Sequence, residues 1–290
     1  MAKPIFSVPM NYRHAFHAGN HADVLKHIVL LALIEALKRK DTPFFVLDTH
    51  AGRGQYLLQG EEAGKTGEAL GGIFRLFVLH GLPALVQRYL KRVQADNPVG
   101  ALVSYPGSPL LAAQAMREQD RLAACELQPE EARALAALFR NDERIGVHQR
   151  DGYGAMKALL PPKEKRGLVL IDPPFEAQEA EFDTVLAALK EALARWPTGI
   201  YALWYPIKQR RTLNPFFRKA AHLPCKSSLF VELLVRPDES PLRLNGSGLL
   251  ILNPPYQLEE ELAPVLPVLA RLLGEDRPNA RLQWLKRENG

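Results

Sequence analysis

The sequence predicts an α/β fold with a largely parallel sheet. Short runs of β-branched and aromatic residues alternate with longer stretches whose apolar residues recur at helical spacing. The length of 290 residues, 47% of them hydrophobic, is enough to bury a sizeable core. Seven strands are expected, at residues 44–49, 123–127, 145–149, 167–172, 199–205, 228–235 and 248–252.

One long segment interrupts this alternation. Residues 56–120 lie between the first two strands, show helical spacing, and exceed the length of an ordinary crossover connection. We therefore predict a helical insertion subdomain at residues 56–120. The main domain would then consist of residues 1–55 and 121–290.

Composition limits the location and the partners of the protein. No apolar run approaches the roughly 20 residues that cross a bilayer, and the first residues lack the apolar core of a signal peptide, so a cytoplasmic protein with no membrane partner is expected. Cys125 and Cys225 have no nearby cysteine partner, which indicates two reduced thiols. The net charge of +5 is compatible with a polyanionic partner.

A helix is predicted at residues 22–40, with Asn20 as its N-cap. The segment before it is rich in histidine, which is one feature of metal sites. However, the Gly-Asn pair at residues 19–20 breaks the helical register that would align His17 with His21, and no carboxylate or cysteine stands at ligand spacing. We expect no metal, and hydrogen-bonding roles near a ligand for these histidines.

The ends of the first three strands carry groups suited to a nucleoside ligand. The first strand runs into a glycine-bearing turn at residues 48–54, which lets backbone approach a ligand closely. Glu126 ends the second strand, where a carboxylate can accept hydrogen bonds from both ribose hydroxyls, and Asp151 and Gly152 follow the third, beside an adenine ring. Each acid could equally cap the next helix. The fingerprint of nicotinamide dinucleotide sites is not present.

The motif at residues 168–175 is a buried strand that ends in Asp172, two prolines and Phe175. In the methylation of an adenine amine, Asp172 could accept one N–H hydrogen bond and the carbonyl of Pro173 the other, which concentrates electron density on nitrogen. Phe175 could stack on the base. These residues predict S-adenosylmethionine as the methyl donor, S-adenosylhomocysteine as its product, and no metal.

A second copy of the pattern lies at residues 253–256, Asn-Pro-Pro-Tyr. In the methyltransferase sheet the seventh strand runs antiparallel to the others, so its end points away from the edge that holds the cofactor. Asn253 is therefore predicted to form a structural turn, and a parallel seventh strand would instead make this copy the better catalytic candidate.

Five segments together resemble the RlmJ family of bacterial 23S ribosomal RNA adenine-N6 methyltransferases, and the likeness covers nearly the whole chain. They lie at residues 11–27, 48–54, 105–109, 172–175 and 201–206. The resemblance implies a class I S-adenosylmethionine-dependent methyltransferase fold, a Rossmann-like seven-stranded sheet with its last strand antiparallel. It also implies 23S ribosomal RNA as the substrate.

The resemblance further implies roles for individual residues. The cofactor pocket would involve His27, His50, Ser108, Glu126, Asp151, Gly152 and Asp172. Asp172, with Pro173 and Phe175, would be catalytic, while Tyr12, His14, Lys26 and Phe175 would contact the substrate, the N-terminal segment 1–22 bordering the active site. Two features depart from the family: Phe175 stands where tyrosine is usual, and about eight extra residues precede Asn11. Neither removes a stacking ring or a hydrogen-bond acceptor.

A basic segment at residues 208–226 gives separate support for a polynucleotide. It contains six lysines and arginines and no acid, and Phe216 and Phe217 add aromatic surface, unless they pack inward from a solvated helix. Two alternatives stay open: the same chemistry on DNA adenine or a protein amide, and a non-catalytic RNA-binding protein. No pattern determines the oligomeric state, and a monomer is the working expectation.

Overall fold

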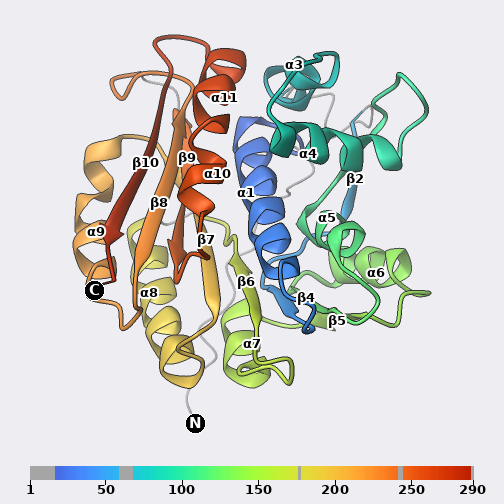
Figure 1. Cartoon of the computed structure of the whole chain (residues 1–290), viewed down its shortest axis with the longest axis vertical. Coiled ribbons are helices and arrows are strands. Elements are labelled where there is room, and N and C mark those ends of the chain that lie inside the picture. The colour runs from blue at the N-terminus through green and yellow to red at the C-terminus, as the bar shows by residue number, and fades with distance from the viewer. Residues whose placement is uncertain (1–16, 59–67, 176–177, 241–243, 289–290) are drawn as a thin grey trace.

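The computed structural model describes residues 17–58, 68–175, 178–240 and 244–288. Within these ranges the main feature is an eight-stranded sheet with helices on both faces (Figure 1). Its strand order is β10-β8-β9-β7-β6-β1-β4-β5. The strands are β1 Phe45–Asp48, β4 Arg121–Glu126, β5 Ile145–Gln149, β6 Gly167–Ile171, β7 Ile200–Ile207, β8 Ser228–Leu234, β9 Gly246–Leu252 and β10 Asn279–Lys286.

The sheet confirms the predicted fold class. Strands β1, β4, β5, β6 and β7 pair in parallel, and β9 lies antiparallel against both β7 and β8. The antiparallel seventh strand, β9, is the arrangement expected for a class I methyltransferase. All seven predicted strands are present, within one or two residues of the expected bounds.

The prediction missed an eighth strand, β10, which pairs antiparallel with β8 at the edge of the sheet. Its side chains do alternate, with Ala280, Leu282 and Trp284 half-buried and the residues between them exposed. An edge strand of this kind carries polar residues on one face and only partial burial on the other, so its pattern is weak.

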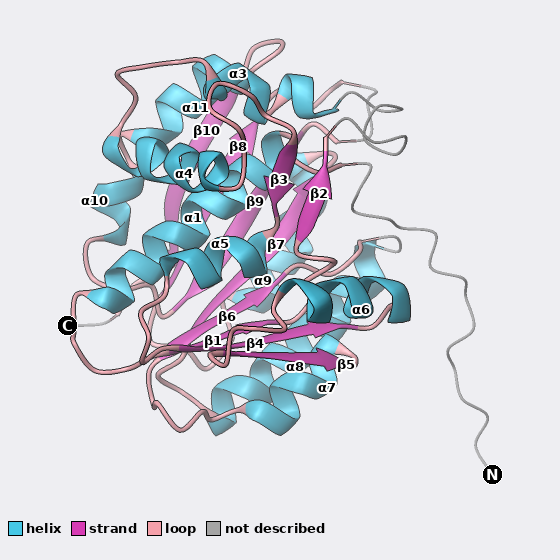
Figure 2. Cartoon of the chain, turned by 90° about the vertical axis from the view of Figure 1, so that its right-hand side faces the viewer, coloured by secondary structure: helices cyan, strands magenta, loops and turns pink. Residues whose placement is uncertain are grey.

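Two hydrophobic clusters hold the helices to the sheet. One face is covered by α1 His21–Lys38, α4 Ala84–Ala95, α5 Ser108–Ala115, α6 Pro129–Leu138, α10 Leu258–Leu262 and α11 Val265–Leu273, and the other by α7 Gly152–Leu159, α8 Gln178–Arg195 and α9 Asn214–Ala220. Figure 2 shows α6 and α7 on opposite sides of the strands β4 and β5. This two-sided cover explains why the central strands β6 and β7 read as nearly continuous apolar runs.

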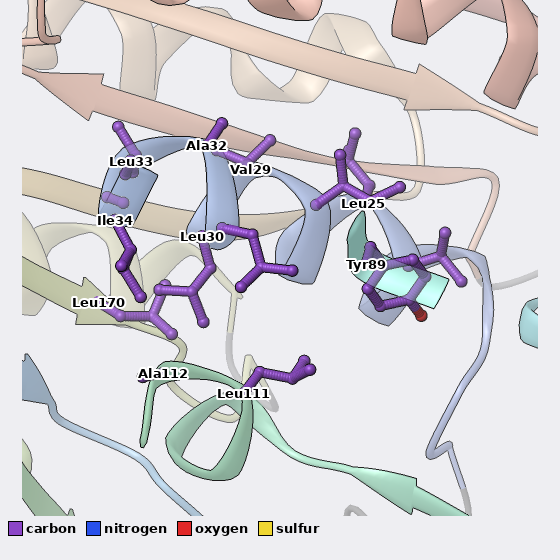
Figure 3. Packing of buried hydrophobic residues seen from close by; sticks show 14 of the residues in the cluster. Leu25, Val29, Leu30, Ala32, Leu33, Ile34, Tyr89, Leu111, Ala112 and Leu170 are labelled. Atoms are coloured by element: carbon purple, nitrogen blue, oxygen red, sulfur yellow. The ribbon is translucent and has the colours of Figure 1, made fainter. Parts of the chain in front are cut away.

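Helix α1 is the central helix of the larger cluster, and it is buried on almost every side. Asn20 caps it as predicted, because its side chain accepts hydrogen bonds from the backbone N–H groups of Ala22 and Asp23. In Figure 3, side chains of α1 such as Leu25 and Leu30 lie among residues of α4, α5 and β6. Full burial of each such leucine stabilises the fold by about 1.5–3 kcal/mol, so the position of α1 relative to the sheet is firmly determined.

The segment predicted as a helical insertion is only partly helical. It contains η2 Glu68–Gly71, α3 Ile73–Phe77, α4 and α5, and also two short strands, β2 Gln55–Leu57 and β3 Ser104–Pro106, which pair antiparallel. Strands of three residues leave too short an alternation to recognise in sequence. The division of the chain at residues 55 and 121 stays a prediction. Among the described helices, none is long and apolar enough to cross a membrane.

Candidate active site at the carboxyl edge of the sheet

Four acids stand at the strand ends of one edge of the sheet, and all but Asp48 were predicted there. Asp48, Glu126, Asp151 and Asp172 stand at or just beyond the carboxyl ends of β1, β4, β5 and β6, which are neighbouring parallel strands. In open α/β sheets this edge is where ligands bind, because strand ends and the starts of helices converge there. Residues far apart in the sequence are therefore gathered on one side of the molecule.

The turn after β1 requires glycine. Gly52 and Gly54 have φ of +60° and +81°, in the left-handed region that other residues rarely adopt. A Cβ on Gly52 would lie 2.1 Å from the hydroxyl of Tyr56. The turn is tied to the neighbouring strand, because the N–H of Gly52 donates to Glu126 Oε2 at 2.9 Å.

Glu126 is held by backbone on both sides. Besides the bond from Gly52, its Oε1 accepts the N–H of Gln128 at 2.7 Å. Burial raises the pKa of this carboxyl, although the backbone hydrogen bonds oppose the shift. A carboxylate has about four lone-pair sites, so Glu126 keeps acceptor capacity for hydroxyl groups. The exposed, apolar Leu127 follows it directly.

Asp151 and Gly152 begin helix α7. Asp151 caps the helix by accepting the N–H of Gly154 at 2.6 Å, so the structural role considered for this acid is present. Gly152 touches the turn after β1, and a Cβ there would lie 2.3 Å from the carbonyl oxygen of Thr49. The start of α7 and the turn after β1 are thus in backbone contact.

His50 is a neutral hydrogen-bonding group beside this contact. Burial lowers its pKa to about 4. The Thr49 hydroxyl donates to the carbonyl of Leu170 at 3.0 Å and therefore accepts from His50 Nδ1, which lies 2.7 Å away. This assigns the hydrogen to Nδ1 and leaves Nε2 as an acceptor. The negative charges of Asp172 and Asp151 oppose this lowering of the pKa.

Two of the residues predicted to bind the cofactor, Ser108 of the 56–120 segment and His27 of α1, form buried hydrogen bonds. The Ser108 hydroxyl donates to Asp48 Oδ2 at 2.6 Å, and burial raises the pKa of Asp48 to about 6. His27 Nδ1 lies 2.7 Å from the hydroxyl of Tyr105, which in turn lies 2.9 Å from that of Tyr89. Asp48 and Tyr89 were given no role from the sequence. Ser108 and Asp48 both lie in segments that resemble the family. That shared resemblance is the signal from which their contact could have been predicted.

The central acid of the site, Asp172, is paired with a lysine from α1. Lys26 Nζ lies 2.5 Å from Asp172 Oδ2 and 2.8 Å from Oδ1 of Asp23. Burial alone would lower the pKa of Lys26, but the two carboxylates raise it well above its usual value, so the ammonium is charged. Among the described residues, none hydrogen-bonds Oδ1 of Asp172. Asp23 was missed from the sequence, although its spacing of three residues from Lys26 on a helix predicts contact.

Aromatic side chains follow Asp172. Pro173 is buried, and the half-buried ring of Phe175 lies 5.1 Å from that of Phe182 and 5.8 Å from that of Trp204. Trp204 Nε1 is buried and has no hydrogen-bond partner among the described residues. Phe175 thus has one side supported by other rings.

The second copy of the pattern, Asn-Pro-Pro-Tyr at residues 253–256, forms a structural turn, as predicted. Because β9 is antiparallel to β7, Asn253 lies at the opposite edge of the sheet from Asp172. It has a φ of +52°, and its amide nitrogen donates to the carbonyls of Pro197 and Gly199 while its oxygen accepts the N–H of Lys226. These bonds fix a turn between three segments.

The basic segment at residues 208–226 is less open than predicted. Phe216 and Phe217 are buried, so they add no aromatic surface. Arg210 donates to Glu232, whose side chain is fully buried, and lies over the ring of Phe217. Lys219 and Lys226 pair with Asp183 and Glu288. The exposed cations with no ion pair within the described part of the segment are Lys208, Arg211 and Arg218.

Other predicted features fall partly outside the structure. Tyr12 and His14 lie outside the described residues. The ring of His17 contacts the Glu68 carboxylate at 2.9 Å. The residues described contain no group of three or more histidine, cysteine or acidic side chains that could hold a metal ion.

Known proteins resemble the chain along almost its full length. The family model described as "Ribosomal RNA large subunit methyltransferase D, RlmJ" matches residues 41–286. Two proteins named "Ribosomal RNA large subunit methyltransferase J" are similar. The one from Escherichia coli (strain K12) is 43% identical over 95% of this chain and 99% of its own. The one from Haemophilus influenzae is 42% identical over 96% of this chain and 100% of its own.

A solved structure has the same architecture. The crystal structure of protein LPL1258 from Legionella pneumophila str. Philadelphia 1 superposes with a TM-score of 0.85 and 37% sequence identity, over 92% of this chain and 98% of that one. With the family model covering most of the chain and identities above 40% over nearly all of it, this chain belongs to the RlmJ family.

Proposed function

We propose that this protein transfers a methyl group from S-adenosylmethionine to the N6 amine of an adenine in 23S ribosomal RNA. The observation that carries the proposal is the position of Asp172, at the carboxyl end of β6, with one carboxylate oxygen bonded to Lys26 and the other not bonded by any described residue. The names of the curated relatives support ribosomal RNA of the large subunit as the substrate.

The residues around the turn after β1 suit S-adenosylmethionine. Glu126 would accept hydrogen bonds from the ribose hydroxyls, and Asp151 with Gly152 would border the adenine ring, where backbone already approaches closely. His27, His50 and Ser108 would complete the pocket, and Asp172 would border it. When bound, S-adenosylmethionine supplies an electrophilic methyl group on sulfur, and S-adenosylhomocysteine is the product.

The target amine needs help to become a nucleophile, because its lone pair is delocalised into the base. Asp172 Oδ1 would accept one N–H of the amine and the carbonyl of Pro173 the other. These bonds strengthen as the nitrogen becomes tetrahedral and gains positive charge, so they stabilise the transition state more than the ground state. Phe175 would stack on the base, with Phe182 and Trp204 supporting its ring.

Lys26 would act on Asp172. Its ammonium contacts the carboxylate directly and is almost fully buried, so it would orient Asp172 at the border of the substrate site. Tyr12 and His14 remain proposed substrate contacts, and Lys208, Arg211 and Arg218 would bind phosphates, since β7 delivers this segment to the same edge of the sheet. We take the protein to act in the cytoplasm as a monomer.

The test is mass spectrometry of nucleosides after incubation of unmodified 23S ribosomal RNA with the protein and S-adenosylmethionine. N6-methyladenosine is expected, and Asp172→Ala should abolish it while binding of S-adenosylhomocysteine, measured by calorimetry, stays within about tenfold. Greater methylation of duplex DNA or of a protein would reject the RNA substrate. Equal methylation by Asp172→Ala and the parent would reject Asp172 as the catalytic residue, and RNA binding with no methylation by the parent would favour a non-catalytic RNA-binding protein.

A further inference from the structure

We propose that Asp23 is a positioning residue for the methyl transfer, acting on Asp172 through Lys26. This inference rests on the proposed function. Asp23, Lys26 and Asp172 form one buried row, in which the lysine ammonium lies 2.8 Å from the first carboxylate and 2.5 Å from the second. The row connects the start of α1 to the end of β6.

Asp23 is anchored independently of the catalytic acid. Its Oδ2 accepts the N–H of Gly19 at 2.9 Å, and it stands in the first turn of α1, where the helix dipole favours a negative charge. Only 3% of its side chain is exposed. Because Asp23 belongs to the same helix as Lys26, it fixes the ammonium relative to α1 before any contact with Asp172.

The 56–120 segment fixes this part of α1 in turn. Ile73 donates its N–H to the carbonyl of Gly19 at 2.8 Å, and the Asn20 amide donates to Glu68 at 2.9 Å. A Cβ on Gly72 would lie 2.0 Å from the Gly19 carbonyl oxygen, so the two backbones are in direct contact. The residues that hold Asp23 are therefore themselves held by a second part of the chain.

Charge explains why a second carboxylate is needed. One lysine and two carboxylates carry a net charge of −1. The ammonium has three N–H donors, and Asp23 takes one of them, so Asp172 keeps negative charge and a lone pair for the amine. Without the Asp23 charge, Asp172 would be the single counter-ion of the Lys26 ammonium. The ammonium would then attract the Asp172 oxygens more strongly and compete with the substrate amine for them.

The experiment is a double-mutant cycle with Asp23→Asn and Lys26→Met, measured with S-adenosylmethionine and 23S ribosomal RNA. Asp23→Asn should lower kcat about 10- to 100-fold and change the KM for S-adenosylmethionine by less than about threefold, as for a loss confined to the transition state. In the Lys26→Met background, Asp23→Asn should have no further effect, since the residue it acts through is gone. Equal effects in both backgrounds would overturn the proposal.

Two further variants separate positioning from folding. Asp23→Glu keeps the charge and should recover most of the kcat that Asp23→Asn loses, whereas equal loss in both variants would contradict the charge argument. Glu35→Gln is the matched control, because Glu35 and Lys38 form a pair at the same spacing on the same helix, 3.1 Å apart. It should leave kcat unchanged, and a comparable loss there would contradict a specific role for Asp23.

The outcomes for the two proposals differ. If the parent protein forms no N6-methyladenosine, the proposed function fails. If the parent is active and Asp23→Asn has the kcat of the parent, the proposed function stands and the role of Asp23 is wrong.

Discussion

The Lys26 ammonium lies 2.5 Å from the Asp172 carboxylate, although 146 positions separate the two residues in the sequence. The contact joins α1 to the end of β6. Because both groups are largely buried, removing Lys26 leaves Asp172 without this counter-charge in a region of low dielectric, whereas removing Asp172 leaves Lys26 paired with Asp23 alone. The site is therefore part of the packing of α1 on the sheet, and substitutions around it should affect stability and activity differently.

Phe175→Leu should lower kcat/KM for RNA by about 5- to 150-fold, the equivalent of the 1–3 kcal/mol typical of stacking between a base and an aromatic ring. Phe175→Tyr keeps the ring and should remain within about threefold of the parent. Steady-state kinetics with 23S ribosomal RNA would measure both. Parent-like kinetics for the leucine variant would show that the ring does not contact the base.

Gly152→Ala should weaken binding of S-adenosylhomocysteine at least about tenfold and destabilise the fold by about 1–3 kcal/mol, as overpacking usually does. The reason is that the new Cβ would lie 2.3 Å from the carbonyl oxygen of Thr49, so α7 must move away from the turn. Calorimetry and thermal unfolding would measure the two effects. Gly71→Ala is the control, because its nearest neighbour would be a Glu275 oxygen at 4.0 Å; equal behaviour of the two variants would refute the explanation.

Asp48→Asn should stabilise the ligand-free protein in alkaline solution. The folded protein holds the pKa of Asp48 at about 6, above its ordinary value of 3.8, because burial disfavours the charged form. The stability associated with the protonated acid is complete below pH 3.8 and is lost as the pH rises through 6, which amounts to about 3 kcal/mol.

The melting temperature of Asp48→Asn should therefore exceed that of the parent at pH 8, and the difference should vanish near pH 4. Asp41→Asn, at an exposed position, serves as the control and should show no such trend. A variant less stable than the parent at pH 8 would mean that the Ser108 hydrogen bond to Asp48 outweighs the cost of burying the charge.

Arg210→Gln should destabilise the fold by about 3–5 kcal/mol, because it leaves the buried carboxylate of Glu232 without its cation. Urea unfolding would measure this. The matched change Arg211→Gln, at the exposed neighbour, should cost less than about 0.5 kcal/mol. If the two variants unfolded at the same urea concentration, the Arg210 pair would contribute nothing to stability.

The exposed cations of the same segment should affect RNA binding instead. Replacing Lys208, Arg211 and Arg218 together by glutamine should reduce the slope of log K against log salt concentration by about 2, given about 0.7 per phosphate contact on single-stranded RNA. Filter binding across salt concentrations would measure the slope. An unchanged slope would place the RNA phosphates elsewhere on the protein.

The sequence alone determined seven of the eight strands of the main sheet and the groups that follow its parallel strands. Apolar runs such as those of β6 and β7 are buried on both faces, and this requirement is visible in composition without knowledge of partners. Parallel order then places the groups that follow β1, β4, β5 and β6 at one edge, so Asp172 could be predicted to lie near Glu126 and Asp151. The structural role of Asn253 was predicted from the antiparallel last strand of the methyltransferase sheet, and the direction of β9 confirms that strand order.

Tertiary structure decided what each group contacts. The contact of Lys26 with Asp172 and the bond of His27 to Tyr105 both join elements distant in the sequence. Periodicity reports which face of an element is buried and says nothing of which element covers it. The element that covers the end of β6 is α1, and its Lys26 sets the charge around Asp172. The position of α1 depends in turn on how it packs with the 56–120 segment at the carboxyl edge of the sheet.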